Sequence, residues 1–227
     1  MIHFVTGTDT DCGKTLVSAA MLVAAQKLPG CHSTLGVKPI ASGCRRTEDG
    51  LRNSDAELLM AHASREFDYD RVNPIAFEPA IAPHIAAREA GVEISPEAIM
   101  AKLDWTSIAR SDFCLIEGAG GWRLPLGEGR FMPELVEALD LPVILVVGMK
   151  LGCLNHALLT QEAILADGLR LAGWVANRVD PNMTHFQDNL DTLKELMTSP
   201  CLGVVPYIPS ASPLEAAAFL DLTPLAQ

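Results

Sequence analysis

The feature that most constrains this chain is a glycine-bounded loop at residues 7–15, which reads Gly-Thr-Asp-Thr-Asp-Cys-Gly-Lys-Thr. An apolar run at 2–5 precedes it and predicts a buried strand, and the run 16–25 after it predicts a helix. This is the context of a phosphate-binding P-loop, in which backbone N–H groups and the helix dipole face an anion. We expect Lys14 beside the terminal phosphates and the Thr15 hydroxyl on a magnesium ion.

The spacing of this loop differs from the common P-loop pattern. Gly7 and Gly13 enclose five residues instead of four, and Thr8 stands where the first glycine normally would. The alternative is a glycine turn into a helix, with Lys14 and Thr15 simply solvated. The strand before the loop and the helix after it favour the nucleotide site.

Composition narrows the classes of protein that remain. Hydrophobic residues make up 49% and aromatic residues 5% of the 227 residues, which predicts an aliphatic core. A formal charge of −11 argues against nucleic-acid binding, which needs a basic face. The six cysteines lack metal-type spacing and favour reduced thiols. Without a signal peptide or a run of membrane-spanning length, a cytoplasmic location and no membrane partner are expected.

Strand and helix patterns alternate along the whole chain. Apolar runs predict further strands at 35–40, 113–116, 142–148, 171–177 and 202–205. Helical spacing and caps predict helices at 56–63, 96–103, 133–139, 154–166 and 183–197. We expect a surface loop at 41–50 and an extended segment at 68–84, which holds three prolines. The pattern predicts an α/β, P-loop NTPase-like fold, a mainly parallel sheet with helices on both faces, as a single domain over residues 1–227.

Polar residues follow several of the predicted strands. Because parallel strands present their carboxyl ends at one edge, Lys38, Glu117 and Asn177 are expected near the P-loop. Glu117 fits a magnesium ligand, and a strand-end carboxylate in water is the alternative. Lys38 fits a cation that neutralises charge during transfer, and an ordinary surface lysine is the alternative.

Two other residues have no single interpretation from local pattern. Asp55 lies in Asn-Ser-Asp at 53–55, and it fits a helix cap and a metal ligand equally well. Cys12 lies in the P-loop itself, where a small loop-filling side chain is favoured over a nucleophile.

Several motifs in register resemble one family, the dethiobiotin synthetases. They are the P-loop at 7–15, Lys-Pro-x-Ala-Ser-Gly at 38–43, Asn-Ser-Asp at 53–55, Pro-His at 83–84, Glu-Gly-Ala-Gly-Gly at 117–121, Lys-Leu-Gly-Cys-x-Asn-His at 150–156 and Gly-Trp-Val-Ala-Asn at 173–177. The five-residue loop spacing is also used by this family. The resemblance runs from residue 2 to about residue 208.

The resemblance implies an ATP- and Mg²⁺-dependent ligase of biotin biosynthesis. Its substrates would be 7,8-diaminononanoate, CO₂ and ATP, and its products dethiobiotin, ADP and phosphate. One amine becomes a carbamate, the γ-phosphate activates it as a mixed anhydride, and the second amine closes the cyclic urea. The family is homodimeric, so a homodimer is implied here.

The resemblance also assigns roles to residues. Lys14 and Lys38 would be catalytic, Lys38 and Ser42 would contact the diamine or carbamate, and Thr15, Asp55 and Glu117 would surround the magnesium. The residues that would contact nucleotide or cofactor are Asp11, Cys12, Gly13, Lys14, Thr15, Leu16, Asp55, Glu117, Gly118, Ala119, Gly120, Asn177, Arg178, Pro206, Tyr207 and Ile208.

Two alternatives to this function remain. One is a related P-loop synthetase that forms amides on cobyrinate. The other is a switch ATPase of the partitioning type, in which hydrolysis controls binding to DNA or membrane. That family typically has a second lysine early in its P-loop, where this chain has Thr8, Asp9 and Thr10. The sequence of the present chain also has no cluster of basic residues that would bind DNA.

Overall fold

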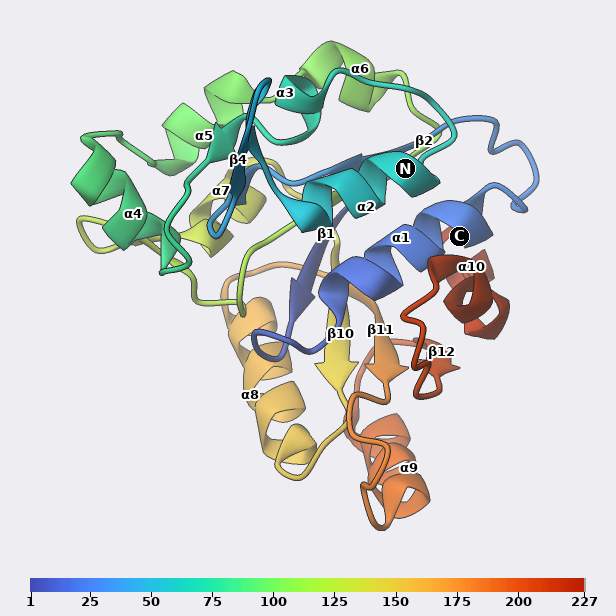
Figure 1. Ribbon diagram of the computed structural model, residues 1–227. Coiled ribbons are helices and arrows are strands. Elements are labelled where there is room, and N and C mark those ends of the chain that lie inside the picture. Colours follow the sequence, from blue (N-terminus) through green and yellow to red (C-terminus); the bar gives the residue numbers. More distant parts are fainter. Residues whose placement is uncertain (227) are drawn as a thin grey trace.

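Six strands pair side by side through the middle of the molecule (Figure 1). The computed structural model describes residues 1–226. In spatial order the strands are β12 (Cys201–Val205), β11 (Leu171–Asn177), β10 (Val143–Gly148), β1 (Ile2–Gly7), β7 (Phe113–Glu117) and β2 (Thr34–Val37). Every neighbouring pair is parallel, so all six carboxyl ends lie at the same edge.

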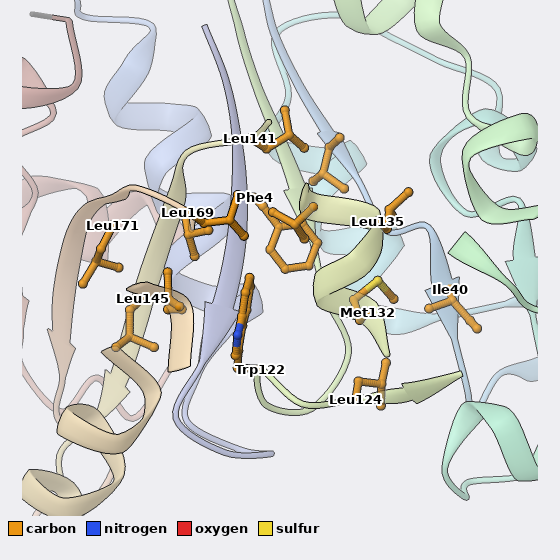
Figure 2. Packing of buried hydrophobic residues seen from close by; sticks show 14 of the residues in the cluster. Phe4, Ile40, Trp122, Leu124, Met132, Leu135, Leu141, Leu145, Leu169 and Leu171 are labelled. Atoms are coloured by element: carbon orange, nitrogen blue, oxygen red, sulfur yellow. The ribbon is translucent and has the colours of Figure 1, made fainter. Parts of the chain in front are cut away.

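Both faces of this sheet are buried, which explains why its strands are almost continuously apolar. Alternate residues enter different clusters: Phe4 packs in one and Val5 in the other. Three helices cover the side of Val5, namely α1 (Lys14–Ala25), α2 (Ser54–His62) and α10 (Pro213–Ala216). The side of Phe4 is covered by α7 (Met132–Ala138), α8 (Cys153–Ala166) and α9 (Phe186–Leu196). Figure 2 shows Phe4, Trp122 and Leu145 packed together on this side.

Shorter elements fill the connections. The helices among them are α3 (Tyr69–Val72), α4 (Pro83–Ala90), α5 (Pro96–Lys102), α6 (Trp105–Ala109) and the 3₁₀ turns η1 (Ala217–Phe219) and η2 (Thr223–Ala226). The small strand pairs are β3 (Ile40–Ala41) with β6 (Ile75–Ala76), β4 (Arg45–Thr47) with β5 (Gly50–Arg52), and β8 (Pro125–Gly127) with β9 (Arg130–Phe131). None of the helices within residues 1–226 combines the length and the apolar content needed to cross a bilayer.

The structure confirms the predicted fold class, with differences in four segments. The strand expected over 35–40 stops at Val37, because Pro39 has no N–H to donate to a ladder, and residues 40–41 pair elsewhere. The helix expected from about 183 begins at Phe186, since His185 is left-handed, with φ +54°. The loop expected at 41–50 and the extended segment at 68–84 contain short strands and helices.

Candidate active site

A cavity of about 620 Å³ opens at the carboxyl ends of β1, β2 and β7. Its polar wall comes from the P-loop, from Lys38 and Ser42, and from the start of α2. Its apolar wall comes from residues 80–83, which lead into α4, and from Leu124. A cavity with an anion-binding loop on one side and aliphatic groups on the other suits a phosphorylated ligand beside an aliphatic one.

The P-loop owes its shape to close contacts that only glycine allows. Gly13 has φ +83°, and a Cβ there would lie 2.0 Å from Nδ2 of Asn177. That amide donates a hydrogen bond of 3.0 Å to the Cys12 carbonyl, which fixes the turn. Lys14 is only 7% exposed, and its ammonium donates to the Asp9 carbonyl at 3.2 Å. The loop is thus held before any phosphate binds, as an anion site at a helix start requires.

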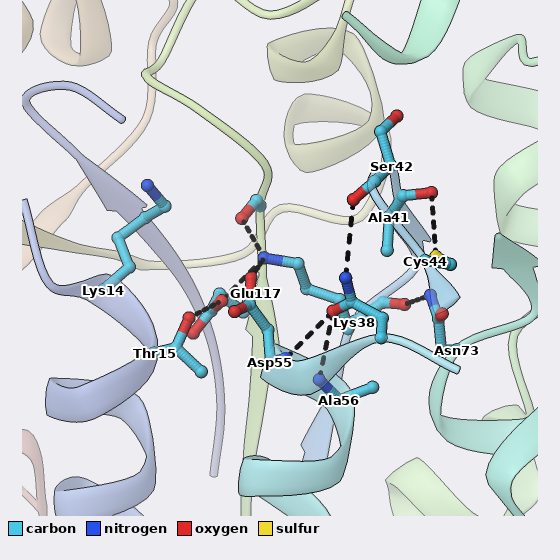
Figure 3. Close-up of polar contacts among 12 residues, drawn as sticks. Lys14, Thr15, Lys38, Ala41, Ser42, Cys44, Asp55, Ala56, Asn73 and Glu117 are labelled. Carbon is cyan, nitrogen blue, oxygen red and sulfur yellow. Dashed lines mark hydrogen bonds and ion pairs between the residues drawn. The ribbon is translucent and has the colours of Figure 1, made fainter. Parts of the chain in front are cut away.

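Lys38 and Glu117 meet because their strands are paired in register. Val37 lies opposite Ile116 in the ladder. Lys38 and Glu117, the residues that follow them, therefore come to the same level at the edge of the sheet. The Lys38 ammonium donates to Oε1 of Glu117 at 2.7 Å and to the Gly118 carbonyl at 3.2 Å, and it lies 2.9 Å from Oδ2 of Asp55 (Figure 3). A cation and two carboxylates therefore form one cluster on the cavity wall.

The charge state of Lys38 follows from this cluster. Burial lowers the pKa of its ammonium, but the Glu117 and Asp55 carboxylates outweigh that effect and hold the pKa above its usual value. Lys38 is therefore a buried cation at neutral pH. Such a group, already oriented, can stabilise negative charge that develops beside it.

The side chains beside Lys38 match the donor chemistry of magnesium. Thr15 Oγ1 donates to Glu117 Oε1 at 2.9 Å, and Oε2 of the same fully buried carboxylate has no hydrogen-bond partner. A hydroxyl with carboxylates is the oxygen set that Mg²⁺ prefers, usually completed by phosphate and water. Within residues 1–226, no group of three or more His, Cys, Asp and Glu side chains could hold a metal, so Thr15 and ligand oxygens would have to contribute.

Asp55 reaches the cluster through the cap of α2. Asn53 is the N-cap, and its Oδ1 accepts from the backbone N–H groups of Asp55 and Ala56 at 3.1 and 3.3 Å. The amide of Asn53 also donates to the Ser42 carbonyl at 3.5 Å, so the cap ties two cavity walls together. The Ser42 hydroxyl oxygen is buried without a partner and remains able to bind a ligand.

The structure brings most of the residues expected from the sequence to the cavity. Asp11, Gly13, Lys14, Thr15, Leu16, Lys38, Ser42, Asp55, Ala119 and Gly120 line it. Glu117 lies beneath the cavity floor with no exposed surface, and Gly118 holds Lys38 through its carbonyl. Cys12 is also buried, and it fills the space above Gly7, where a Cβ would lie 2.2 Å from its sulfur.

The residues expected around an adenine base lie apart from this cavity. Asn177 is buried and bonded to the P-loop. The Arg178 guanidinium donates to the Pro181 carbonyl at 2.9 Å and lies 4.9 Å from the centre of the Phe186 ring. The stretch 206–208 follows β12, where Tyr207 is 46% exposed.

Sequence reasoning missed two parts of the site. Asn53 lines the cavity, although sequence reasoning singles out only Asp55 from the Asn-Ser-Asp motif. The apolar wall at residues 80–83 falls in a segment without periodicity, and of these residues only Pro83 belongs to a family motif. The three prolines between 68 and 84 were the available signal of a fixed, non-repetitive path.

Comparison with known proteins agrees with this geometry. A family model described as "AAA domain" matches residues 3–215. The "ATP-dependent dethiobiotin synthetase BioD" of Pseudomonas paraeruginosa (strain DSM 24068 / PA7) is 54% identical over 222 residues, covering 98% of this chain and 96% of the relative. The protein of that name from Cellvibrio japonicus (strain Ueda107) is also 54% identical over 222 residues, with the same shares covered.

Solved structures share the fold at low sequence identity. A ParA family ATPase from Chlorobium tepidum TLS matches with a TM-score of 0.55 and 16% identity, covering 99% of this chain and 92% of that one. The septum site-determining protein MinD complexed with Mg-ADP from Pyrococcus horikoshii OT3 matches with a TM-score of 0.55 and 18% identity, covering 95% and 86%. At this level of identity the likeness concerns the P-loop fold alone.

Proposed function

The chain belongs to the ATP-dependent dethiobiotin synthetases, and we propose that it converts 7,8-diaminononanoate, CO₂ and ATP into dethiobiotin, ADP and phosphate. Family membership makes it an ATP-dependent enzyme of biotin biosynthesis; the substrates and the C–N ligase chemistry are the proposal. The observation that carries it is the Lys38–Glu117–Asp55 cluster, which faces a cavity between a P-loop and an aliphatic wall.

The chemistry proceeds in three balanced steps. An amine of the diamine adds to CO₂ and loses a proton, which gives a carbamate. A carbamate oxygen attacks the γ-phosphorus of ATP, and ADP leaves. The second amine then attacks the carbonyl carbon of the mixed anhydride and loses a proton, phosphate leaves with the C–O bond electrons, and the cyclic urea closes.

Two lysines meet the electrostatic demand of the second step. Carbamate and γ-phosphate are both anionic, so their approach is unfavourable unless cations lie beside them. Lys14 and Lys38 both line the cavity. Both ammonium groups already have backbone carbonyl partners, at 3.2 Å each, which supports roles in positioning and charge stabilisation.

Thr15, Asp55 and Glu117 are the residues that would hold a magnesium ion. Bound there with ATP, the ion would supply charge neutralisation at the phosphates. The unpartnered Oε2 of Glu117 supports this assignment, because a fully buried carboxylate oxygen without a donor is costly.

The remaining contacts follow the two walls of the cavity. We assign Ser42 to the diamine or carbamate, which its unpartnered hydroxyl oxygen supports. The amides of residues 12–16 and 118–120 would hold phosphates and the substrate rim. Asn177, Arg178 and the stretch 206–208 remain the proposed adenine contacts, although their present partners lie elsewhere in the chain.

We also propose that residues 1–227 act as one domain, in the cytoplasm, as a homodimer. One sheet flanked by two apolar clusters supports the first point. All six cysteines are free thiols, as a reducing compartment would keep them. The Leu151 side chain, 95% exposed ahead of α8, supports a covering partner copy. Light scattering after gel filtration would give the mass that tests the dimer.

The decisive experiment measures phosphate release from ATP with Mg²⁺ and bicarbonate, with and without 7,8-diaminononanoate. We expect release that depends on the diamine and is matched one-to-one by dethiobiotin, identified by mass. Release that ignores the diamine and yields no cyclic product would overturn the proposal and favour the switch ATPase. Stimulation of that release by DNA or lipid would then identify the switch class.

A further inference from the structure

A chain of hydrogen bonds behind the cavity links the segment that carries Lys38 to the helix that carries Asp55. It involves three residues that touch neither cluster carboxylate: Asn73, Tyr69 and Asn53. Asn73 is only 3% exposed and Asn53 6%, so their polar atoms must find partners within the protein. The function proposed above assigns no role to Tyr69, Asn73 or Asn53.

At one end, Asn73 holds the backbone of Lys38. Its Nδ2 donates to the Lys38 carbonyl at 2.7 Å and to the Ile75 carbonyl at 3.3 Å, as Figure 3 shows for the first of these. The Lys38 N–H donates to the Val72 carbonyl at 2.8 Å. Both peptide groups of Lys38 are therefore fixed by the segment 72–73, at the point where Pro39 ends the strand.

In the middle, Tyr69 joins the two asparagines through one oxygen. Its hydroxyl donates to Oδ1 of Asn73 at 2.9 Å and accepts from the backbone N–H of Asn53 at 2.6 Å. The hydroxyl uses its one proton for the first bond and a lone pair for the second, so both hydrogen bonds can exist at the same time. The Arg52 guanidinium lies 4.2 Å from the centre of the Tyr69 ring and holds the ring from the other side.

At the far end, Asn53 holds the first turn of α2. The two N–H groups that its Oδ1 accepts are those of Asp55 and Ala56. A shift of Asn53 therefore moves the Asp55 carboxylate, while a shift of Asn73 moves the Lys38 ammonium. The Lys38 ammonium and the Asp55 carboxylate lie 2.9 Å apart, so their separation depends on every hydrogen bond that links Asn73, Tyr69 and Asn53.

We propose that Tyr69 and Asn73 are positioning residues that set the distance between Lys38 and the Asp55 carboxylate, and through them the response of the site to magnesium. This inference rests on the proposed function for its activity readout. Supporting partners of ligand side chains typically change metal affinity or activity by about 10–100-fold when removed. The P-loop is not part of the chain of bonds, so nucleotide affinity without metal is expected to stay constant.

The test compares Tyr69→Phe, Asn73→Ala and the double variant with wild type. Gln161→Ala is the matched control: Gln161 is 6% exposed and bonded to the Leu196 carbonyl and the Thr198 N–H, on the α8 side of the sheet. We expect kcat to fall about tenfold in Tyr69→Phe, with the KM for ATP within about twofold of wild type. The kcat of the double variant should fall no further than that of the more impaired single variant, because both substitutions break the same series of hydrogen bonds.

Two readouts need no turnover. Calorimetry of ADP binding with excess EDTA should give the wild-type affinity, while the gain in affinity on adding Mg²⁺ should shrink about tenfold in Tyr69→Phe. Amide hydrogen exchange at Asp55 and Ala56 should accelerate in that variant and stay slow in Gln161→Ala.

The outcomes separate the two proposals. A wild-type protein without diamine-dependent product would refute the proposed function, and the binding and exchange readouts would still test the positioning chain. An active wild type with an unchanged magnesium effect in Tyr69→Phe would overturn the inference. The inference would also be overturned if the losses of kcat in the two single variants added in the double variant, or if Gln161→Ala lost as much kcat as they do.

Discussion

The Lys38 ammonium lies 2.7 Å from Oε1 of Glu117, a carboxylate with no exposed surface. Each group makes the burial of the other tolerable, because an isolated buried charge costs several kcal/mol. The second oxygen of Glu117 has no partner, and the Thr15 hydroxyl shares the first. The pair is therefore a preformed charged group beside the cavity, and one carboxylate oxygen is still free to bind a ligand.

Replacing Lys38 should remove catalysis and leave nucleotide binding. In Lys38→Ala we expect dethiobiotin formation to fall by about 10²- to 10³-fold, the typical loss when one oriented donor to developing charge is removed. ADP binding, measured by calorimetry, should survive because the P-loop keeps its own contacts. Retained binding also shows that the variant is folded, despite the unpaired Glu117.

Lys102→Ala is the control for this change, since Lys102 lies on the exposed side of α5. It should keep wild-type turnover. Wild-type turnover in Lys38→Ala would remove Lys38 from the mechanism.

Replacing Glu117 should change the magnesium requirement. Glu117→Gln keeps the shape of the side chain and removes its charge, so the magnesium concentration for half-maximal product formation should rise about tenfold or more. Glu195→Gln, an exposed change on α9, is the matched control. An unchanged magnesium titration in Glu117→Gln would rule out ligation by this residue.

The meeting of Lys38 and Glu117 could be predicted because it follows from topology. Both residues come at the ends of apolar runs, and parallel strands bring such ends to one edge. The sheet and most of its covering helices were predictable because periodicity and caps are local signals, whereas the four-residue α10 is too short to show a period. Gly13 and Lys14 were recognisable because a P-loop is a contiguous motif.

The parts of the site that the sequence did not predict depend mostly on contacts between residues far apart in the sequence. Asp55 fits a cap from its neighbours alone, and its distance of 2.9 Å to Lys38 is set by how α2 packs. Asn73 holds a residue 35 positions earlier and lies in a segment whose helix and strand are too short to show a period. Arg178 is different, because its guanidinium donates to carbonyls only two and three residues further along, in a turn that the Gly-Trp-Val-Ala-Asn motif does not include.

Adding a single methyl group at Gly13 should abolish nucleotide binding. Gly13→Ala would bring a Cβ to 2.0 Å from Asn177 Nδ2, in a backbone with φ +83°. The amide would have to move and release the Cys12 carbonyl, which would open the turn. We expect ADP binding by calorimetry to fall at least about tenfold, since the loop amides lose their common direction.

The control separates the clash from the backbone strain. Gly30→Ala has a similar φ of +78°, and a Cβ there would meet nothing within 4 Å. It should lose about 1 kcal/mol of stability from the left-handed backbone and keep full ADP binding. If both variants bind ADP equally well, the contact with Asn177 does not shape the site.

A buried histidine at the start of β1 should make the protein sensitive to mild acid. Burial, and then the nearby N-terminal ammonium and Arg170, lower the pKa of His3 from 6.5 to about 4. Its Nδ1 has no hydrogen-bond partner, so the neutral ring is the form that fits. The unfolded chain takes up a proton as the pH falls below 6.5, while the folded protein resists until about 4.

The stability that His3 contributes is therefore complete above about pH 6.5 and is lost as the pH falls towards 4. Between pH 7 and pH 5 we expect this group to lower the free energy of unfolding by about 2 kcal/mol. Urea denaturation at both values measures the loss. His3→Gln should lose about 2 kcal/mol less than wild type over this interval, because its side chain cannot be protonated. Equal losses in the two proteins would show that His3 is protonated in the folded state.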